Sequence, residues 1–224
     1  MTDWSAFWLS IQVTLCGLAI AVAVGLPLAV LLALRRFPGR NLLEVLVTAP
    51  LVLPPTVLGY YVLVSVGRSS AIGRFWESLT GGPIVFSMTG CVLAATIAAL
   101  PFVVKNSRSA LEAVDPGLME AAANLGAGFP RRLWTILLPL ARRGIIGGCM
   151  LGFAKALGDF GVTLMVAGNI PGRTQTAPLA IYDHLLSGRD AQAQGLVLAL
   201  TGLGILVLWL VNTWANPRPT DRRS

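Results

Sequence analysis

Charged and metal-ligating side chains are scarce in this sequence. Asp, Glu, Lys and Arg make up 12% of its 224 residues, about half of the share that is usual in soluble domains. There is one histidine, and each of the three cysteines lies in an apolar stretch, with no C-x-x-C spacing and no Cys/His cluster. These absences argue against a zinc site and a disulfide framework, so we expect no metal site.

Sequence motifs for ATP binding and hydrolytic chemistry are also missing. No G-x-x-x-x-G-K-[ST] segment occurs, so this chain has no Walker site of its own for ATP. Neither G-x-S-x-G nor H-E-x-x-H occurs, which argues against an intramembrane enzyme. We therefore expect no catalytic residues and no cofactor bound by this chain.

Long apolar runs are abundant instead, since 55% of the residues are hydrophobic. Crossing the hydrocarbon core of a bilayer takes about 20 such residues in a helix. The sequence predicts an all-α integral membrane protein with one domain, 1–224, and no room for a separate soluble catalytic domain. Its five predicted spans are 8–34, 46–66, 84–104, 144–166 and 195–214.

The basic residues predict the orientation of these spans. On one side of a five-span arrangement lie Arg35, Arg36, Arg40, Lys105, Arg108, Arg131, Arg132, Arg142, Arg143, Arg218, Arg222 and Arg223. On the other side lie only Arg68, Arg74, Arg173 and Arg189. Cytoplasmic loops carry the excess of Lys and Arg, so we expect the N-terminus outside and the C-terminus in the cytoplasm. The net charge of +7 follows from this bias, and no nucleic-acid partner is expected.

Prolines interrupt the second predicted span. Pro54 and Pro55 lie inside it, and Pro50 comes about one turn earlier. Each proline removes a backbone donor, so together they should bend or open the helix. Irregular backbone at this depth is tolerated where it is buried in protein or lines an aqueous cavity. Both readings stay open, and Pro54, Pro55 and Thr56 are candidate residues of a translocation path.

The fourth predicted span combines small residues with a charged pair. A strip of tiny side chains recurs every four residues, at Gly144, Gly148, Gly152 and Ala156, which predicts close packing against another helix. Lys155 and Asp159 are also four residues apart. They could neutralise each other on one helix face, or they could line a polar path, because ionisable groups inside a membrane usually face a bundle interior or an aqueous cavity.

The segment 168–190 follows on the outer side. Apolar residues recur there at helical spacing and stop at Gly188, which predicts a short amphipathic helix of about ten residues, too short to cross the membrane. Thr174, Gln175 and Thr176 before it are further candidates for the path. His184 is expected on the outer surface, with no specific role.

The cytoplasmic loop between the third and fourth spans, about 105–143 and called the coupling loop below, contains a predicted short helix. Asp115 followed by Pro116 is a typical helix start, and Gly126 is placed to end the helix. Small and apolar residues in between would let the helix lie closely against another surface. Composition alone does not exclude an interfacial helix without a partner.

Spacing within this loop is more specific. Glu120, Ala121, Ala122, Gly126, Ile136, Leu138 and Pro139 stand at the spacing found in permeases of ABC importers, and the loop resembles their coupling helix. This resemblance implies a type I ABC importer permease fold in the bacterial cytoplasmic membrane. The partners it implies are a second permease copy, two cytoplasmic ATPase subunits that carry ATP and Mg, and an extracytoplasmic oxyanion-binding protein.

Within that family, the segments 53–61 and 156–182 resemble molybdate permeases, which pass molybdate or tungstate inward. Asp159 occupies a position where members more often carry Glu. Sulfate and thiosulfate permeases share the coupling loop and remain an alternative. A second alternative, from another class, is an ion-coupled secondary transporter that uses Lys155 and Asp159 as a proton relay.

Overall fold

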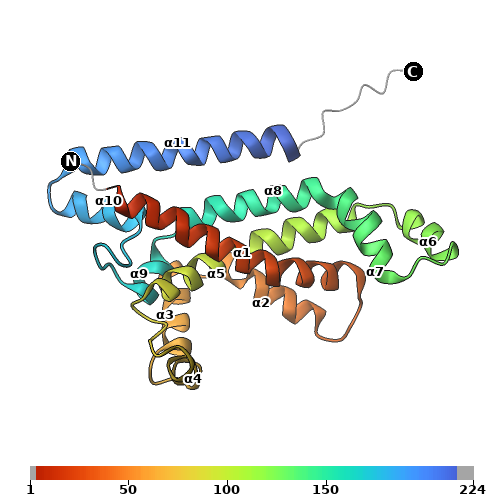
Figure 1. The fold of residues 1–224 in the computed structure, drawn as a ribbon, viewed down its shortest axis with the longest axis horizontal. Coiled ribbons are helices and arrows are strands. Elements are labelled where there is room, and N and C mark those ends of the chain that lie inside the picture. Colours follow the sequence, from red (N-terminus) through yellow and green to blue (C-terminus); the bar gives the residue numbers. More distant parts are fainter. Residues whose placement is uncertain (1–3, 216–224) are drawn as a thin grey trace.

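The computed structural model describes residues 4–215, and within this range the regular elements are helices. Long helices run side by side along the longest axis of the molecule (Figure 1). The bounds of the helices are α1 Ser5–Leu34, α2 Arg40–Val52, α3 Pro55–Val66, α4 Ala71–Thr80, α5 Met88–Glu112, α6 Pro116–Asn124, α7 Phe129–Arg132, the π-helix η1 Leu133–Leu137, α8 Leu138–Leu157, α9 Gly161–Ala167, α10 Ala177–Leu186 and α11 Asp190–Ala215. The predicted tail arginines Arg218, Arg222 and Arg223 lie outside the described residues.

Four helical segments within residues 4–215 are long and apolar enough to cross a membrane. They are Ser5–Leu34, Met88–Glu112, Phe129–Leu157 and Asp190–Trp214. Three of them correspond to the predicted first, third and fifth spans. The all-helical membrane fold predicted from hydropathy is confirmed.

The second predicted span, 46–66, is not one helix. Its chain forms α2 and α3, separated at Leu53 and Pro54, and α3 turns steeply away from the direction of the bundle (Figure 1). Neither Pro54 nor Pro55 has an N–H to continue the hydrogen-bond ladder, which explains the position of the break. The predicted opening of this helix by prolines is confirmed. The five-span count remains a prediction.

The chain of the fourth predicted span, 144–166, is not one continuous helix either. The helix begins earlier, through α7 and η1, and α8 stops at Leu157. The bounds of the membrane span itself remain a prediction. The carboxylate of Asp159 accepts hydrogen bonds from the backbone N–H and the hydroxyl of Thr163, at 2.9 and 2.7 Å. Because these bonds offer the backbone an alternative to a continuous helix, a new helix, α9, starts after the break.

Small side chains hold the bundle together. α5 lies between α1 and α8 and packs against both. A Cβ atom added to Gly144 would lie 2.5 Å from the Cβ of Ala110, and one added to Gly148 would lie 2.7 Å from the Cβ of Asn106. The predicted strip of small residues on the fourth span is therefore a packing seam between α5 and α8. Close backbone approach of this kind is what glycine and alanine permit between membrane helices.

Salt bridges connect α2 to the end of α5. Arg108 of α5 contacts Glu44 at 2.7 Å and Glu112 at 2.8 Å, and Arg40 of α2 lies 3.4 Å from Glu112. The hydrogen bond from Arg108 lowers the pKa of the Glu44 carboxyl below its ordinary value. This network fixes the N-terminal part of α2 beside the coupling loop.

Two features of the predicted outer side were not expected. The chain 71–80 forms the helix α4, which leaves the large apolar side chains of Ile72, Phe75 and Leu79 exposed. His184 is buried, at 6% exposure, so its predicted place on the surface is wrong. It lies on α10, which packs against α11.

Candidate functional site

The short helix α6 lies at one end of the molecule, beyond the ends of the long helices (Figure 1). The carboxylate of Asp115 accepts a hydrogen bond from the backbone N–H of Gly117 at 2.8 Å, and Pro116 takes the first helical position. This geometry satisfies an N–H group that the first turn leaves free. The helix start predicted from Asp115 and Pro116 is confirmed.

Gly126 ends α6 in the left-handed backbone region, with φ of +81°. The N–H of Gly126 donates to the carbonyl of Ala123, and the N–H of Ala127 donates to that of Ala122. This pair of bonds is the Schellman motif, which typically requires glycine at its left-handed position. The predicted glycine stop is confirmed.

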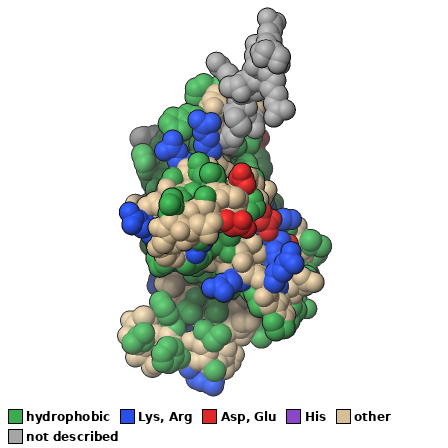
Figure 2. Space-filling view, turned by 90° about the vertical axis from the view of Figure 1, so that its right-hand side faces the viewer, with side chains coloured by type: hydrophobic (Ala, Val, Ile, Leu, Met, Phe, Trp, Pro, Cys, Tyr) green, Lys and Arg blue, Asp and Glu red, His purple; other side chains and the backbone are tan. Residues whose placement is uncertain are grey.

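No residue of α6 is buried. Leu118 is 47% exposed and Leu125, directly after the helix, is 87% exposed. Glu120 and Ala121 are also exposed, and Ala122 is half-buried. Exposed leucines at this end of the molecule present an apolar surface without a partner in this chain. Figure 2 looks onto this end and shows apolar and acidic groups here, with Lys and Arg side chains around them.

Two contacts attach α6 to the bundle. Met119 packs into a cluster that includes Leu111, Leu133 and Leu137. Arg132 donates a hydrogen bond to the backbone carbonyl of Met119 at 3.2 Å. A displacement of α6 would therefore reach α5 through Leu111, and η1 through Leu133 and Leu137.

The second half of the coupling pattern lies on η1 and at the start of α8. Ile136 and Leu138 are half-buried, and Pro139 is exposed. The N–H of Leu138 donates to the carbonyl of Leu133, five residues back. Pro139 has no N–H to offer and its ring crowds the carbonyl four residues earlier, so widening the turn accommodates it. The π-helix was missed in the sequence, although Pro139 inside a helical pattern was its signal.

The two helix breaks meet in space. A Cβ atom added to Gly161, at the start of α9, would lie 2.6 Å from the Cβ of Pro55, at the start of α3. Pro54, Pro55 and Thr56 are exposed beside this contact. The candidate path residues of the second span are thus brought close to the break that contains Asp159.

Lys155 and Asp159 do not form the predicted pair on one helix. Lys155 is exposed on α8, whereas Asp159 lies beyond the end of α8 and is buried at 7% exposure. The carboxylate of Asp159 bonds to Thr163, and Lys155 takes part in none of the salt bridges formed by residues 4–215. The two residues therefore form no salt bridge across one helical turn, because the helix ends between them. Whether they line a path stays a prediction.

The candidate residues of the outer loop have mainly structural contacts. Thr174 is fully buried, and its hydroxyl accepts a hydrogen bond from the N–H of Ile170 at 3.1 Å. Thr176 is buried, and the next residue, Ala177, donates from its N–H to the hydroxyl of Ser10 on α1 at 2.7 Å. Gln175 is half-buried and borders a cavity of about 270 Å³ beside the start of α1. Whether these residues line a path stays a prediction.

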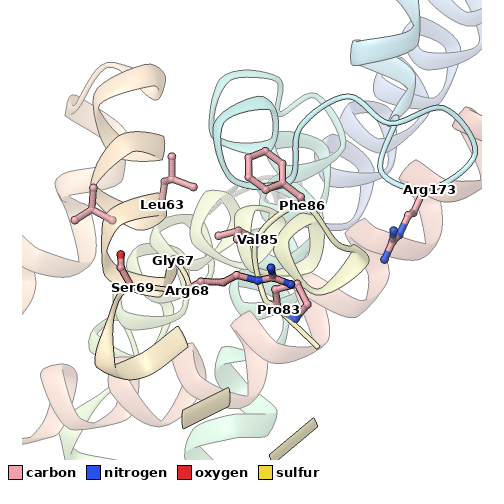
Figure 3. A pocket seen from close by; sticks show the side chains of 9 residues that line it. Leu63, Gly67, Arg68, Ser69, Pro83, Val85, Phe86 and Arg173 are labelled. Carbon is pink, nitrogen blue, oxygen red and sulfur yellow. The ribbon is translucent and has the colours of Figure 1, made fainter. Parts of the chain in front are cut away.

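A larger pocket, of about 800 Å³, lies between the end of α3 and the loop before α5 (Figure 3). Its lining includes Leu63, Val64, Arg68, Pro83, Phe86 and Arg173. Sequence reasoning missed this pocket, because its residues come from three separate segments and share no pattern.

Comparisons with known proteins agree with this arrangement. Residues 25–218 match the family model of the binding-protein-dependent transport system inner membrane component. The chain is 41% identical to the molybdenum transport system permease protein ModB of Escherichia coli K12, over 95% of this chain and 93% of that protein. It is 38% identical to the ModB of Azotobacter vinelandii, over 92% of each chain.

Solved structures share the fold. A chain of the MetNI methionine ABC transporter, in inward-facing conformations, superposes with a TM-score of 0.71 at 19% identity, over 93% of this chain and 92% of that one. A chain of a bacterial alginate ABC transporter, solved with an alginate-bound periplasmic protein, superposes with a TM-score of 0.66 at 16% identity, over 93% of this chain and 77% of that one. The chain therefore belongs to the binding-protein-dependent transport system inner membrane components, and among them to the molybdenum transport system permeases, as a multi-pass protein of the inner membrane.

Proposed function

We propose that this chain is the membrane subunit of an ATP-driven importer that moves molybdate, or the chemically similar tungstate, across the cytoplasmic membrane. The observation that carries this proposal is the similarity to molybdenum permeases along nearly the whole chain. The exposed coupling segment supports the same conclusion, since it offers a separate ATPase a surface to bind.

ATP hydrolysis belongs to a partner in this account. The chain has no Walker motif, and α6 leaves Leu118 and Leu125 exposed. The complex would contain two copies of this permease, two ATPase subunits that hold ATP and Mg, and an extracytoplasmic oxyanion-binding protein. Each permease would cross the membrane five times, with the chain from α2 to α3 as an interrupted second span, the N-terminus outside and the C-terminus inside.

Coupling would begin at α6. Closure of the ATPases would displace α6, and the contacts of Met119 and Arg132 would transmit the displacement to α5 and η1. Because α5 and α8 are packed along a close seam, the two helices would move together as a rigid body. Such a movement would open the path alternately to the two sides of the membrane.

The path itself would run past the two helix breaks. Interrupted helices at membrane depth expose backbone groups that can hold an ion where they line a cavity. Pro54, Pro55 and Thr56 lie at one break, and Lys155 and Asp159 flank the other. Lys155, the exposed cation of this group, would attract the anion.

The experiment that tests the proposal is ATP hydrolysis by the reconstituted complex. Molybdate-loaded binding protein should stimulate hydrolysis and uptake, and sulfate-loaded binding protein should not. Stimulation by a sulfate-loaded protein alone would instead assign the chain to the sulfate and thiosulfate permeases. Uptake that needs no ATPase would contradict the proposal altogether.

A further inference from the structure

The pocket lies between the end of α3 and the loop before α5. In Figure 1, α3 and α4 project from the half of the molecule away from α6, and α10 lies at the end of the bundle opposite α6. This end carries the few basic residues predicted for the outer side. Arg74 donates to the backbone carbonyl of Ser69, and Arg189 pairs with Asp183 at 3.0 Å. The other two, Arg68 and Arg173, both line the pocket.

The guanidinium groups of Arg68 and Arg173 are available for a partner. Arg173 takes part in none of the ion pairs within residues 4–215. Arg68 lies 3.4 Å from Glu77, but its side chain is 65% exposed, and exposed pairs of this kind contribute little. Figure 3 shows the two arginines reaching into the pocket from different segments.

Phe86 borders the same pocket in an unusual backbone conformation. Its φ is +54°, in the left-handed region that bulky residues rarely adopt. The N–H of Phe86 donates to the carbonyl of Val166 at 3.0 Å, and the aromatic ring lies beside Gly168. The backbone of Phe86 is thus strained, and its aromatic ring is half-exposed at the pocket. Strained residues of this kind are often found at sites that bind ligands or partners.

We infer that this pocket is the surface on which the extracytoplasmic binding protein docks, and that it receives an acidic loop of that protein with an adjoining apolar side chain. The inference rests on the proposed function. Three features select this occupant. The volume of about 800 Å³ is many times that of one tetrahedral oxyanion. The walls are mainly apolar, and arginine with an aromatic residue is the composition that protein interfaces favour. Arg173, which forms no ion pair within residues 4–215, and Arg68, whose pair with Glu77 is exposed, both favour a partner with negative charge.

The test titrates molybdate-loaded binding protein against the complete transporter in nanodiscs and measures stimulated ATP hydrolysis. Arg68→Glu and Arg173→Glu should each raise the concentration for half-maximal stimulation by at least about threefold, and the double variant by roughly tenfold. Maximal hydrolysis at saturating binding protein should be unchanged. The half-maximal concentration should rise with salt in the parent and much less in the double variant. Arg189→Glu makes the same charge change outside the pocket and should behave like the parent.

Three outcomes would overturn the inference while leaving the proposed function intact. The first is unchanged affinity in both pocket variants, and the second is an equal loss in Arg189→Glu. The third is lower maximal hydrolysis with unchanged affinity, which would place the arginines on the path of the free oxyanion. If molybdate-loaded binding protein stimulates no hydrolysis even in the parent, the proposed function itself fails.

Discussion

Gly126 lies at the junction between the two halves of the coupling loop. An added Cβ would meet no atom within 4 Å, so the left-handed φ of +81° is what requires glycine within this chain. For most other residues this left-handed conformation costs about 1–2 kcal/mol of conformational free energy, and for Asn it costs less. The residue therefore controls where α6 stops and where α7 starts.

Replacing Gly126 should weaken the coupling between the ATPase and the permease, so that stimulated ATP hydrolysis and uptake fall together. Gly126→Val forces a β-branched residue into the left-handed region, so α6 should lose its stop, and stimulated hydrolysis and uptake should fall at least about tenfold. Gly126→Asn should keep most activity. Gly128→Ala is the matched control, because Gly128 has a φ of −62° that any residue adopts. Equal uptake in reconstituted vesicles for Gly126→Val and Gly128→Ala would show that the glycine stop does not matter.

Asp159 is the one buried acid among the described residues. Its carboxylate accepts two hydrogen bonds from Thr163, and bonds to a charged group contribute about 1.5–3 kcal/mol. Its first role in this account is therefore to hold the break between α8 and α9.

Variants at this break separate a structural acid from a proton relay. Asp159→Ala and Thr163→Val should both lower the thermal stability of the purified complex. The effect should be larger for Asp159→Ala, because it removes both hydrogen bonds to the carboxylate, whereas Thr163→Val removes only the one from the hydroxyl. A relay would behave differently. Loss of uptake in Asp159→Asn with full stability, together with dependence on a proton gradient, would favour the secondary transporter.

At the scale of elements, the seam between α5 and α8 carries the movement proposed for transport. Gly148→Val would place its Cβ 2.7 Å from Asn106 and 3.1 Å from the carbonyl oxygen of Phe102. Such overpacking lowers stability by about 1–3 kcal/mol, so thermal melting of the detergent-purified protein should shift downward.

A second glycine provides the control for that prediction. An added Cβ on Gly202 of α11 meets nothing within 4 Å, and alanine has the higher helix propensity. Gly202→Ala should leave the melting temperature unchanged or slightly raised. If Gly148→Val melts like Gly202→Ala, the two helices are not closely packed in the membrane.

The elements differ in how far the sequence could predict them. α6 was predictable from Asp115 and Gly126, because both of its ends are set by local capping. The opening at Pro54 was predictable because proline lacks a donor. By contrast, hydropathy continued through Gly158 and Asp159, so the break that depends on the bonds to Thr163 was missed.

The features that the sequence did not predict, the burial of His184 and the outer pocket, depend on tertiary packing. His184 is buried because α10 packs against α11, which no local pattern indicates. The outer pocket needs Arg68, Phe86 and Arg173 from distant segments. Among the candidate site residues, the coupling role of the residues grouped by spacing stays a prediction, whereas Thr174 and Thr176 are polar in the sequence but buried in the structure.

At the scale of the whole molecule, the two ends of the bundle have different surfaces. One end presents α6 with its exposed leucines, and the other presents the arginine-lined pocket. The long helices between them are packed through small residues, which allows them to move as rigid bodies. In the proposed mechanism, a displacement of α6 by the ATPase moves the path, which lies about 20–30 Å away, roughly the length of a helix that spans the membrane.

The most direct test is molybdate uptake by vesicles that contain the complete transporter, with ATP supplied on the ATPase side and loaded binding protein on the other. Uptake should require ATP and should be unaffected when the proton gradient is collapsed. Leu125→Asp, on the exposed face beside α6, should abolish uptake while the permease remains inserted and folded. Uptake that persists in Leu125→Asp would show that the surface beside α6 does not couple the ATPase to transport, and uptake that runs on a proton gradient without ATP would show that the protein is not an ATP-driven importer.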